Sequence, residues 1–585
     1  MTVAVLEGAT RRVPEMLRQY WLPGLALLLT LLLVALPLAV LILSSFRTGT
    51  PWLPGPFSFS NYVNAYSAAQ TYTIFANTVL IAVVATAISL GVALFFAFLT
   101  ERTDMPFRNL AWGLLLVPLA MPGILYAVAW TFLLTPRIGL FNIWLRGALS
   151  LFGLDLSEGP FNIYSLPGMI FLEGMRGVTT TFLIVVGAFR AMDPALEEAA
   201  RVSGASGART WFKVSIPLLT PAILAATMYS FMSHLESLEI PIIIGLPARV
   251  FVFPTYIYFS TQRYMPPQYG LAAALGATFL VVSLLLVFWY RRVLSRSNRF
   301  ATITGKGYRP RILRLGAWRY PAFLVFVAYF VLTIAAPALI LFWSSLLPTP
   351  MAPSFDLLDS LSWRNYRAVL NAPGTWKAAV NTLIVTGVTA SLTMALALIV
   401  GWAVVRRKFT GAAGLDALTF LPHSIPGIII GISLVYLAFL PPFGSLRLFG
   451  GLTIIILGLT MSYIAFGSRT MISAVAQIHA EMEEAAVTSG ARWRAVMTRI
   501  VVPLLLPAFI GGWIWVASHA FRNFSVPLVL TSRDNMLLSV LMWRAWDDGS
   551  PGQTSALGVL LIVALGLFAV AGRLLVSRLS RQQAS

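Results

Sequence analysis

Cysteine is absent from this chain of 585 residues, and histidine occurs only four times, as His234, His423, His479 and His519. The lack of cysteine excludes disulfides, thiolate metal ligands and cysteine nucleophiles. So few histidines argue against a histidine-rich metal cage. We therefore expect no metal site and no catalytic residues, and the sequence shows no convergent catalytic cluster.

Charged residues are also scarce, at 11% of the chain, whereas hydrophobic residues make up 58% and the mean hydropathy is +0.82. This composition is too apolar for a soluble protein. The formal charge of +20 could indicate a nucleic-acid partner, but Lys and Arg lie in short clusters between apolar segments. We interpret these clusters as topology signals and predict an all-α polytopic protein in a lipid bilayer, with no nucleic-acid partner.

Twelve apolar segments of roughly 20 residues predict transmembrane helices. They lie near 22–45, 74–99, 109–134, 166–190, 217–240, 270–290, 320–345, 379–404, 415–440, 452–475, 505–528 and 555–577. The first follows Arg11, Arg12 and Arg18 like a signal peptide, but it is longer than a signal sequence and lacks a small-residue cleavage site, so we predict a retained span. Basic residues recur in alternate loops, which the positive-inside rule assigns to the cytoplasm together with both termini.

One spaced pattern occurs twice: Glu-Ala-Ala, three residues, Gly, nine residues, an aliphatic, one residue, an aliphatic and Pro. The copies are Glu198, Ala199, Ala200, Gly204, Val214, Ile216, Pro217 and Glu484, Ala485, Ala486, Gly490, Ile500, Val502, Pro503. Every position lies 286 residues from its counterpart. A single Glu-Ala-Ala would carry little information, because both residues are common in helices. Two full copies in register, each between the fourth and fifth predicted spans of its half, indicate a shared role.

Other landmarks recur at a spacing of 304 residues: Asn61-Tyr62 with Asn365-Tyr366, Asn77-Thr78 with Asn381-Thr382, and Pro122-Gly123 with Pro426-Gly427. The change from 304 to 286 locates an 18-residue insertion between Pro136 and Ser165. Six spans per half predict two parallel repeats related by an axis along the membrane normal. We predict a first repeat at 1–290 with its core at about 73–290, a basic cytoplasmic linker at 291–319, and a second repeat at 320–585 with its core at about 377–577.

The loop that carries the first copy of the pattern is predicted to form two short helices with a bend. Asp193-Pro194 suits a helix start, acidic residues suit the first turn, and Gly204 interrupts the helix. The second loop has His479-Ala480 in place of Asp-Pro. Small alanines beside a glycine bend allow another surface to approach closely, whereas a plain solvated connector would not explain two copies with fixed spacing.

The two loops resemble the Glu-Ala-Ala coupling loops of inner-membrane permeases from type I, binding-protein-dependent ABC importers. The similarity covers most of both halves, and the doubled single chain is most similar to ferric-iron permeases, whose relatives handle thiamine, polyamines, phosphonates or sulfate. In that family the loop docks into a groove on a cytoplasmic ATPase. The resemblance implies this role for Glu198, Ala199, Ala200, Gly204, Glu484, Ala485, Ala486 and Gly490.

The resemblance also implies partners: two copies of a cytoplasmic ABC ATPase, which use ATP and Mg²⁺, and a periplasmic or lipid-anchored binding protein that delivers the solute. The chain has no Walker A motif, so we expect it to bind no cofactor and not to be an enzyme. Its expected location is the bacterial inner (plasma) membrane, as a multi-pass protein. Ferric iron is the favoured solute, with thiamine, polyamine, phosphonate or sulfate as alternatives.

Ionisable residues within spans are costly and mark candidate translocation paths. The fifth span of the first half ends with His234, Glu236 and Glu239, and the matching segment of the second half has His519, Arg522 and Asn523. These residues either line the path or include a structural ion pair of Glu236 or Glu239 with Arg522. No ligand set for bare iron is present, which a permease fed by a binding protein does not require.

Three further polar sites have structural interpretations. Glu173 and Arg176 are three residues apart on a predicted helix and are expected to pair. His423, between Pro422 and Pro426, is expected to be a satisfied core histidine, and Asn77 and Asn381 are expected to cap helices or bind across an interface. Two other function classes stay open: an ion-coupled secondary transporter, which would leave the doubled loop unexplained, and a membrane enzyme or scaffold.

Overall fold

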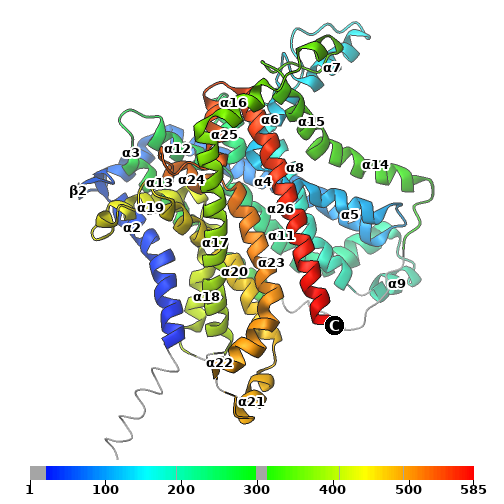
Figure 1. Cartoon of the computed structure of the whole chain (residues 1–585). Helices are drawn as coiled ribbons and strands as arrows, with labels where there is room; N and C mark the ends of the chain where they lie inside the picture. Colours follow the sequence, from blue (N-terminus) through cyan, green and yellow to red (C-terminus); the bar gives the residue numbers. More distant parts are fainter. Residues whose placement is uncertain (1–20, 193, 298–311, 407–408, 492, 585) are drawn as a thin grey trace, which may run out of the picture.

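The computed structural model describes residues 21–584 except 193, 298–311, 407–408 and 492, and it is a bundle of long helices (Figure 1). Within these residues, ten helices are long and apolar enough to cross a membrane: Trp21–Ser45, Ala69–Arg102, Leu166–Arg190, Trp211–Leu235, Tyr269–Trp289, Gly316–Leu346, Pro373–Arg406, Leu452–Gln477, Met497–Arg522 and Pro551–Gly572. Each overlaps one predicted span, so the all-α polytopic prediction is confirmed.

The remaining two predicted spans, 109–134 and 415–440, are not straight helices. Arg108–Ala120 and Gly123–Leu134 meet at 100°, and Ala412–Ser424 and Gly427–Phe439 meet at 110°. Each break lies at a Pro-Gly pair, where Pro122 and Pro426 are extended and end the preceding 3₁₀ turns. A side chain at Gly123 would overlap Glu239, and one at Gly427 would press on Ser525. The bends therefore depend on these glycines and repeat between the halves.

The shorter elements lie mostly at the ends of the bundle. Two strands, β1 (Arg47–Thr50) and β2 (Leu53–Phe57), form an antiparallel hairpin. The helices outside the long spans are α3 (Ser60–Ser67), α5 (Arg108–Leu116), η2 (Val117–Ala120), α6 (Gly123–Leu134), α7 (Leu140–Ser150), α9 (Pro194–Val202), α10 (Gly207–Thr210), η4 (Pro241–Gly245), α12 (Phe253–Gln262), η8 (Phe355–Ser360), α16 (Arg364–Asn371), α18 (Ala412–Phe420), η9 (Leu421–Ser424), α19 (Gly427–Phe439), η10 (Phe443–Leu446), α21 (Ala480–Thr488), α22 (Trp493–Val496), α24 (Ser525–Leu530) and α25 (Leu538–Asp547). The α7 helix accounts for the predicted insertion.

The long spans comprise α2 (Leu36–Ser45) after η1 (Leu31–Ala35), α4 (Ala69–Arg102), α8 (Leu166–Ala191), η3 (Trp211–Ser215) with α11 (Ile216–Leu235), α13 (Tyr269–Ser297), η6 (Gly316–Trp318) with α14 (Arg319–Phe330), η7 (Val331–Ala335) and α15 (Ala336–Leu346), α17 (Pro373–Arg406), α20 (Leu452–Gln477), η11 (Met497–Val501) with α23 (Val502–Arg522), and α26 (Pro551–Ala584). In each half the second span packs along the fourth, α4 on α8 and α17 on α20, and the fifth packs against both.

The two halves exchange their first spans. The α2 helix contacts α13 of its own half and α19 of the other, and α15 contacts α26 and, across the halves, α6 (Figure 1). Each broken span is thus covered by the opposite half. Figure 1 also shows α9, α21 and the C-terminus toward one end of the bundle, and α7 and α16 at the other.

The repeated landmarks make repeated contacts. Asn61 Nδ2 donates to the carbonyls of Ser45 and Arg47, and Asn365 Nδ2 donates to those of Ser345 and Leu347. Asn77 and Asn381 neither cap helices nor bind across the halves, contrary to our expectation. They lie inside α4 and α17, where their amides hold the segment that follows the fifth span, through the carbonyls of Phe251 and Met536.

Candidate functional site

The two copies of the spaced pattern form two loops of the same design, which we call the first motif loop (194–215) and the second motif loop (480–501). Each has two short helices, α9 and α10 or α21 and α22, followed by a π-helical turn that leads into the fifth span. The predicted pair of helices with a bend is confirmed. Asp193 lies outside the described residues, so its role at the helix start stays a prediction.

The spacing from Ala-Ala to Gly has a backbone explanation. Gly204 and Gly490 have φ of +83° and +85°, a left-handed conformation that glycine adopts without strain. The amide of Ala205 donates to Ala200 O at 3.0 Å, and the amide of Ala491 donates to Ala486 O at 3.0 Å. This is the bonding of a Schellman motif, which ends a helix. The pattern therefore encodes a helix of fixed length with a fixed stop.

The side chains of the first pattern face outward. Glu198 and Ala199 are exposed and Ala200 is half-buried, and in the second loop Ala485 is exposed and Ala486 half-buried. The side chain of Glu484 lies outside what the structure describes. Large apolar side chains accompany them: Leu196 is 42% exposed, Val202 89% and Met482 45%. An exposed apolar surface on a short polar loop is typical of a docking site for another protein.

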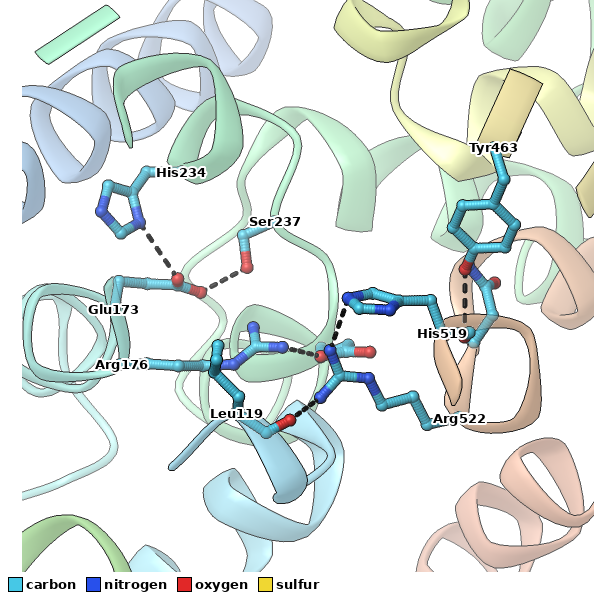
Figure 2. Close-up of polar contacts among 10 residues, drawn as sticks. Leu119, Glu173, Arg176, His234, Ser237, Tyr463, His519 and Arg522 are labelled. Atoms are coloured by element: carbon cyan, nitrogen blue, oxygen red, sulfur yellow. Dashed lines mark hydrogen bonds and ion pairs between the residues drawn. The ribbon is translucent and has the colours of Figure 1, made fainter. Parts of the chain in front are cut away.

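The second candidate site lies where the halves meet, and Figure 2 shows its polar contacts. Glu173 and His234 are buried, with Glu173 Oε2 3.3 Å from His234 Nδ1, and Ser237 Oγ donates to the other carboxylate oxygen. His234 Nε2 lies 3.3 Å from Ser89 Oγ, which donates its one hydrogen to Gly174 O. The ring of His234 therefore joins the second and fourth spans, through Ser89 and Glu173, to the fifth.

Arg176 Nη2 pairs with Glu239 Oε2 at 2.7 Å. Two expectations are therefore wrong. Glu173 does not pair with Arg176, because each has a partner on the segment around the end of α11 that comes closer. Glu239 does not pair with Arg522 across the halves, because Arg176 is the nearer cation.

Arg522, at the end of α23, connects this cluster to the broken span of the first half. Its guanidinium donates to Leu119 O, a carbonyl freed by the break after η2, and to His519 Nε2 at 2.9 Å (Figure 2). His519 Nδ1 must donate to Trp515 O, 2.9 Å away, since a carbonyl only accepts. Both nitrogens of His519 are thus engaged, and Asn523 donates to Tyr463 Oη at 2.8 Å.

Glu236 differs from the other acids of this cluster, because its carboxyl group makes no hydrogen bond or ion pair with any described residue while the residue is only half-buried. It lies 286 residues before Arg522, so the two occupy matching positions of the repeat. Once Glu173 is matched with His234 and Arg176 with Glu239, Glu236 is the carboxylate of this cluster that remains without a cation. The sequence suggested both residues for the path but not their equivalence, which the spacing of 286 already contained.

His423 is not the satisfied core histidine that we expected. It lies in η9, its side chain is exposed, and its ring stacks on Tyr229 of the first half with ring centroids 5.6 Å apart. Leu119 and His423 are 304 residues apart and therefore match in the repeat. Each broken span thus presents its 3₁₀ turn to the fifth span of the opposite half, Leu119 to Arg522 and His423 to Tyr229.

Among the described residues, no group of three or more His, Cys, Asp or Glu side chains could hold a metal ion.

Comparison with known proteins identifies residues 387–583 with the family described as binding-protein-dependent transport system inner membrane component. Together with the long apolar helices, this makes the chain a multi-pass inner-membrane protein. The chain is 26% identical to the ferric transport system permease protein of Actinobacillus pleuropneumoniae over 69% of this chain and 57% of that protein. It is 23% identical to an Fe(3+)-transport system permease protein of Haemophilus influenzae over 94% of this chain and 97% of that protein.

A third relative is named for a different solute. The chain is 29% identical to the sulfate transport system permease protein of Salmonella typhimurium, over 31% of this chain and 68% of that protein. The chain thus spans less than two thirds of the Actinobacillus relative, and nearly all of the Haemophilus protein.

Proposed function

We propose that this chain, whose residues 387–583 belong to the inner membrane components of binding-protein-dependent transport systems, is the transmembrane permease subunit of an ATP-driven importer. One observation carries the proposal: two motif loops of the same design leave the bundle between the fourth and fifth spans, each with an exposed alanine and a glycine-ended helix. One ATPase would dock on each loop. ATP and Mg²⁺ would bind to the ATPases and not to this chain.

The remaining partners follow from this arrangement. The motif loops would lie in the cytoplasm, and a periplasmic or lipid-anchored binding protein would deliver the solute at the opposite end. Two of the contacts between the halves, Arg522 on Leu119 and Tyr229 on His423, would close the path between these ends. Solute passage would require both contacts to separate when the ATPases close.

Ferric iron is the solute we propose, because ferric permeases of two species are similar to the chain over most of its length. The carboxyl group of Glu236 supports a cation, since the residue is only half-buried and the carboxyl group has no cationic partner among the described residues. The sulfate relative and Arg522 support the alternative of an anion. Uptake of radioactive ferric citrate and of sulfate by cells that express or lack the chain separates the two.

The first prediction tests the class of transporter through the two glycines. Replacing both, by Gly204→Val and Gly490→Val, places a branched side chain at positive φ, which costs about 1–2 kcal/mol at each site. We expect loss of ATP-driven uptake in proteoliposomes and loss of the ATPase that copurifies with the tagged chain, while the chain still inserts.

Gly207→Ala is the matched control, because Gly207 lies in the same loop without a positive φ and an added Cβ meets nothing within 4 Å. Normal uptake by the double variant would refute the importer function. Uptake that persists without ATP and stops when an ionophore collapses the ion gradients would instead identify a secondary transporter.

A further inference from the structure

Each motif loop is attached to the second span of its half through the acid that precedes the Glu-Ala-Ala pattern. The spans α4 and α17 end at Arg102 and Arg406, which lie 304 residues apart. The preceding acids are Glu197 and Glu483, which lie 286 residues apart. We call Arg102, Glu197 and Ser215 the first clamp, and Arg406 with Glu483 the second clamp.

The second clamp is a direct ion pair. Arg406 Nε donates to Glu483 Oε1 at 2.9 Å, and an Nη2 hydrogen goes to Ile478 O, just beyond the end of α20. The side chains of both residues are mostly buried, at 14% and 17% exposure. One guanidinium thus joins three elements: the second span, the end of the fourth span and the helix of the motif loop.

The first clamp has the same parts in a looser arrangement. Arg102 Nη2 donates to the carbonyls of Phe189 and Met192 at the end of α8, at 3.2 and 3.4 Å. Its Nε is buried without a hydrogen bond, 3.8 Å from Glu197 Oε1. Glu197 instead accepts a hydrogen bond of 2.7 Å from Ser215, at the start of the fifth span. The second half has Val501 at the position of Ser215 and cannot make this bond.

The inter-half linker also reaches the first clamp. The amide of Leu313 donates to Arg102 O at 2.8 Å, and Asp104 N donates to Leu313 O at 3.0 Å. Leu313, Arg102 and Glu197 line one cavity of about 650 Å³ together with apolar side chains of α4. The first motif loop therefore borders this cavity beside Arg102, whose Nε makes no hydrogen bond.

Adjacent acids on the same helix point in different directions, because successive residues are separated by 100°. Glu198 is exposed, whereas the side chain of Glu197 is only 13% exposed. A carboxylate that faces the spans is poorly placed to bind an external partner, and an arginine that only ended a helix would not need an acid from another element. The two acids therefore have separate tasks.

We propose that Arg102 with Glu197 and Arg406 with Glu483 are positioning residues that transmit movement of the docked ATPases to the second and fourth spans. This inference rests on the proposed importer function. The second clamp transmits more rigidly than the first, because its charged pair is in direct contact. Loss of Glu483 therefore uncouples transport more severely than loss of Glu197.

The test is Glu483→Ala in the complete complex of chain, copurified ATPase and binding protein, reconstituted in proteoliposomes. We expect the solute taken up per ATP hydrolysed to fall about tenfold, within the range of typical coupling free energies. Basal ATP hydrolysis and the amount of copurified ATPase should stay unchanged, which a loss of folding or of docking would not permit. Glu197→Ala should reduce the same ratio by only about twofold to threefold.

Two further variants serve as controls for the effect of Glu483→Ala. Glu481→Ala is the matched control, since Glu481 is exposed on the same helix and has no ion pair among the described residues. Glu483→Gln keeps an acceptor for Arg406 Nε and should retain most of the coupling ratio, even if the alanine variant does not insert.

Four outcomes overturn the clamps: an unchanged ratio in Glu483→Ala, loss of the ATPase from that complex, an equal effect of Glu481→Ala, or a defect as severe in Glu483→Gln. Failure of the importer function is distinct, because the wild-type chain would then show no ATP-driven uptake at all.

Discussion

The two halves have the same helices but fill the space between their fourth and fifth spans differently. The first half has the buried cluster of Ser89, Glu173 and His234, and the matching positions of the second half have Thr393, Leu459 and Ala520. The second half instead stacks Phe466 on Trp515 and Trp515 on His519, with ring centroids 3.6 and 3.7 Å apart. The contact between the fourth and fifth spans therefore contains a buried polar cluster in the first half and an aromatic stack in the second.

Close helix contacts explain why the architecture tolerates this exchange. A Cβ added at Gly177 would overlap Ser89 and His234. A Cβ added at Gly467 would lie 3.0 Å from the Ala397 side chain. Small residues let helix backbones approach closely in membranes, where lipid supplies no hydrophobic drive for helix association. The polar cluster is then a local substitution within a packing that both halves share, and it can be tested as one.

The largest expected effect comes from replacing only one member of the Glu173–His234 pair. Glu173→Leu places the residue of the second half in the first and leaves His234 buried without its acid. We expect a loss of about 3–5 kcal/mol in the free energy of unfolding, because removal of one member of a buried pair leaves the other member without its partner. Thermal unfolding in detergent, followed by tryptophan fluorescence, measures the change.

Glu173→Leu combined with His234→Ala completes the substitution and should recover most of the lost stability, since both members of the pair are replaced by the residues of the second half. A double variant as unstable as the single one would show that the two halves pack differently after all.

The next effect concerns Glu236 and Arg522, an acid and a base at matching positions of the repeat. If the solute is a cation, Glu236→Gln should lower its uptake roughly tenfold, since a charge-assisted contact contributes about 1.5–3 kcal/mol. Initial rates of ferric uptake at equal amounts of inserted protein measure the effect. Glu101→Gln is a control outside the cluster, because Glu101 pairs with Arg190 at the end of the second span. A rise in uptake would favour an anionic solute.

The smallest expected effect concerns an ion pair that only the second half has, at the end of the bundle opposite to the motif loops. Lys377 pairs with Asp534 at 2.6 Å, whereas the first half has Thr73 and Ala248 at these positions. The hydrogen bond and charge of Lys377 lower the pKa of Asp534 below its ordinary value of 3.8. A lowered folded-state pKa stabilises the protein above pH 3.8 and ceases to do so as the pH falls through the folded-state value.

Lys377→Ala should therefore lower the unfolding temperature slightly near neutral pH, with wild type and variant converging in acid. Thr73→Ala, at the matching position of the first half, should show no such pH dependence. A difference that grew as the pH fell would contradict the assignment, and exposure of both side chains keeps the expected shift small.

Several features of the site were accessible from the sequence because they depend on local spacing. The Ala-Ala to Gly interval fixes the length and end of the motif helices, and the Pro-Gly pairs mark the positions of the two breaks. The partners of Glu173, Arg176 and His423 were not accessible. Each partner depends on which side chain of another span comes closest. Glu173 and Arg176 lie three residues apart on one helix, yet each pairs with a residue more than 60 positions away in sequence.

The sequence by itself determined a duplicated, all-α membrane protein with two copies of a spaced loop, because hydropathy, charge and spacing are properties of the chain alone. Only the tertiary structure decided that the broken spans turn by 100° and 110°, that the halves exchange their first spans, and that the acid before each pattern turns inward to Arg102 or Arg406. The physical reason is that a span must satisfy its buried polar groups within the protein, and their partners are chosen by packing across the bundle.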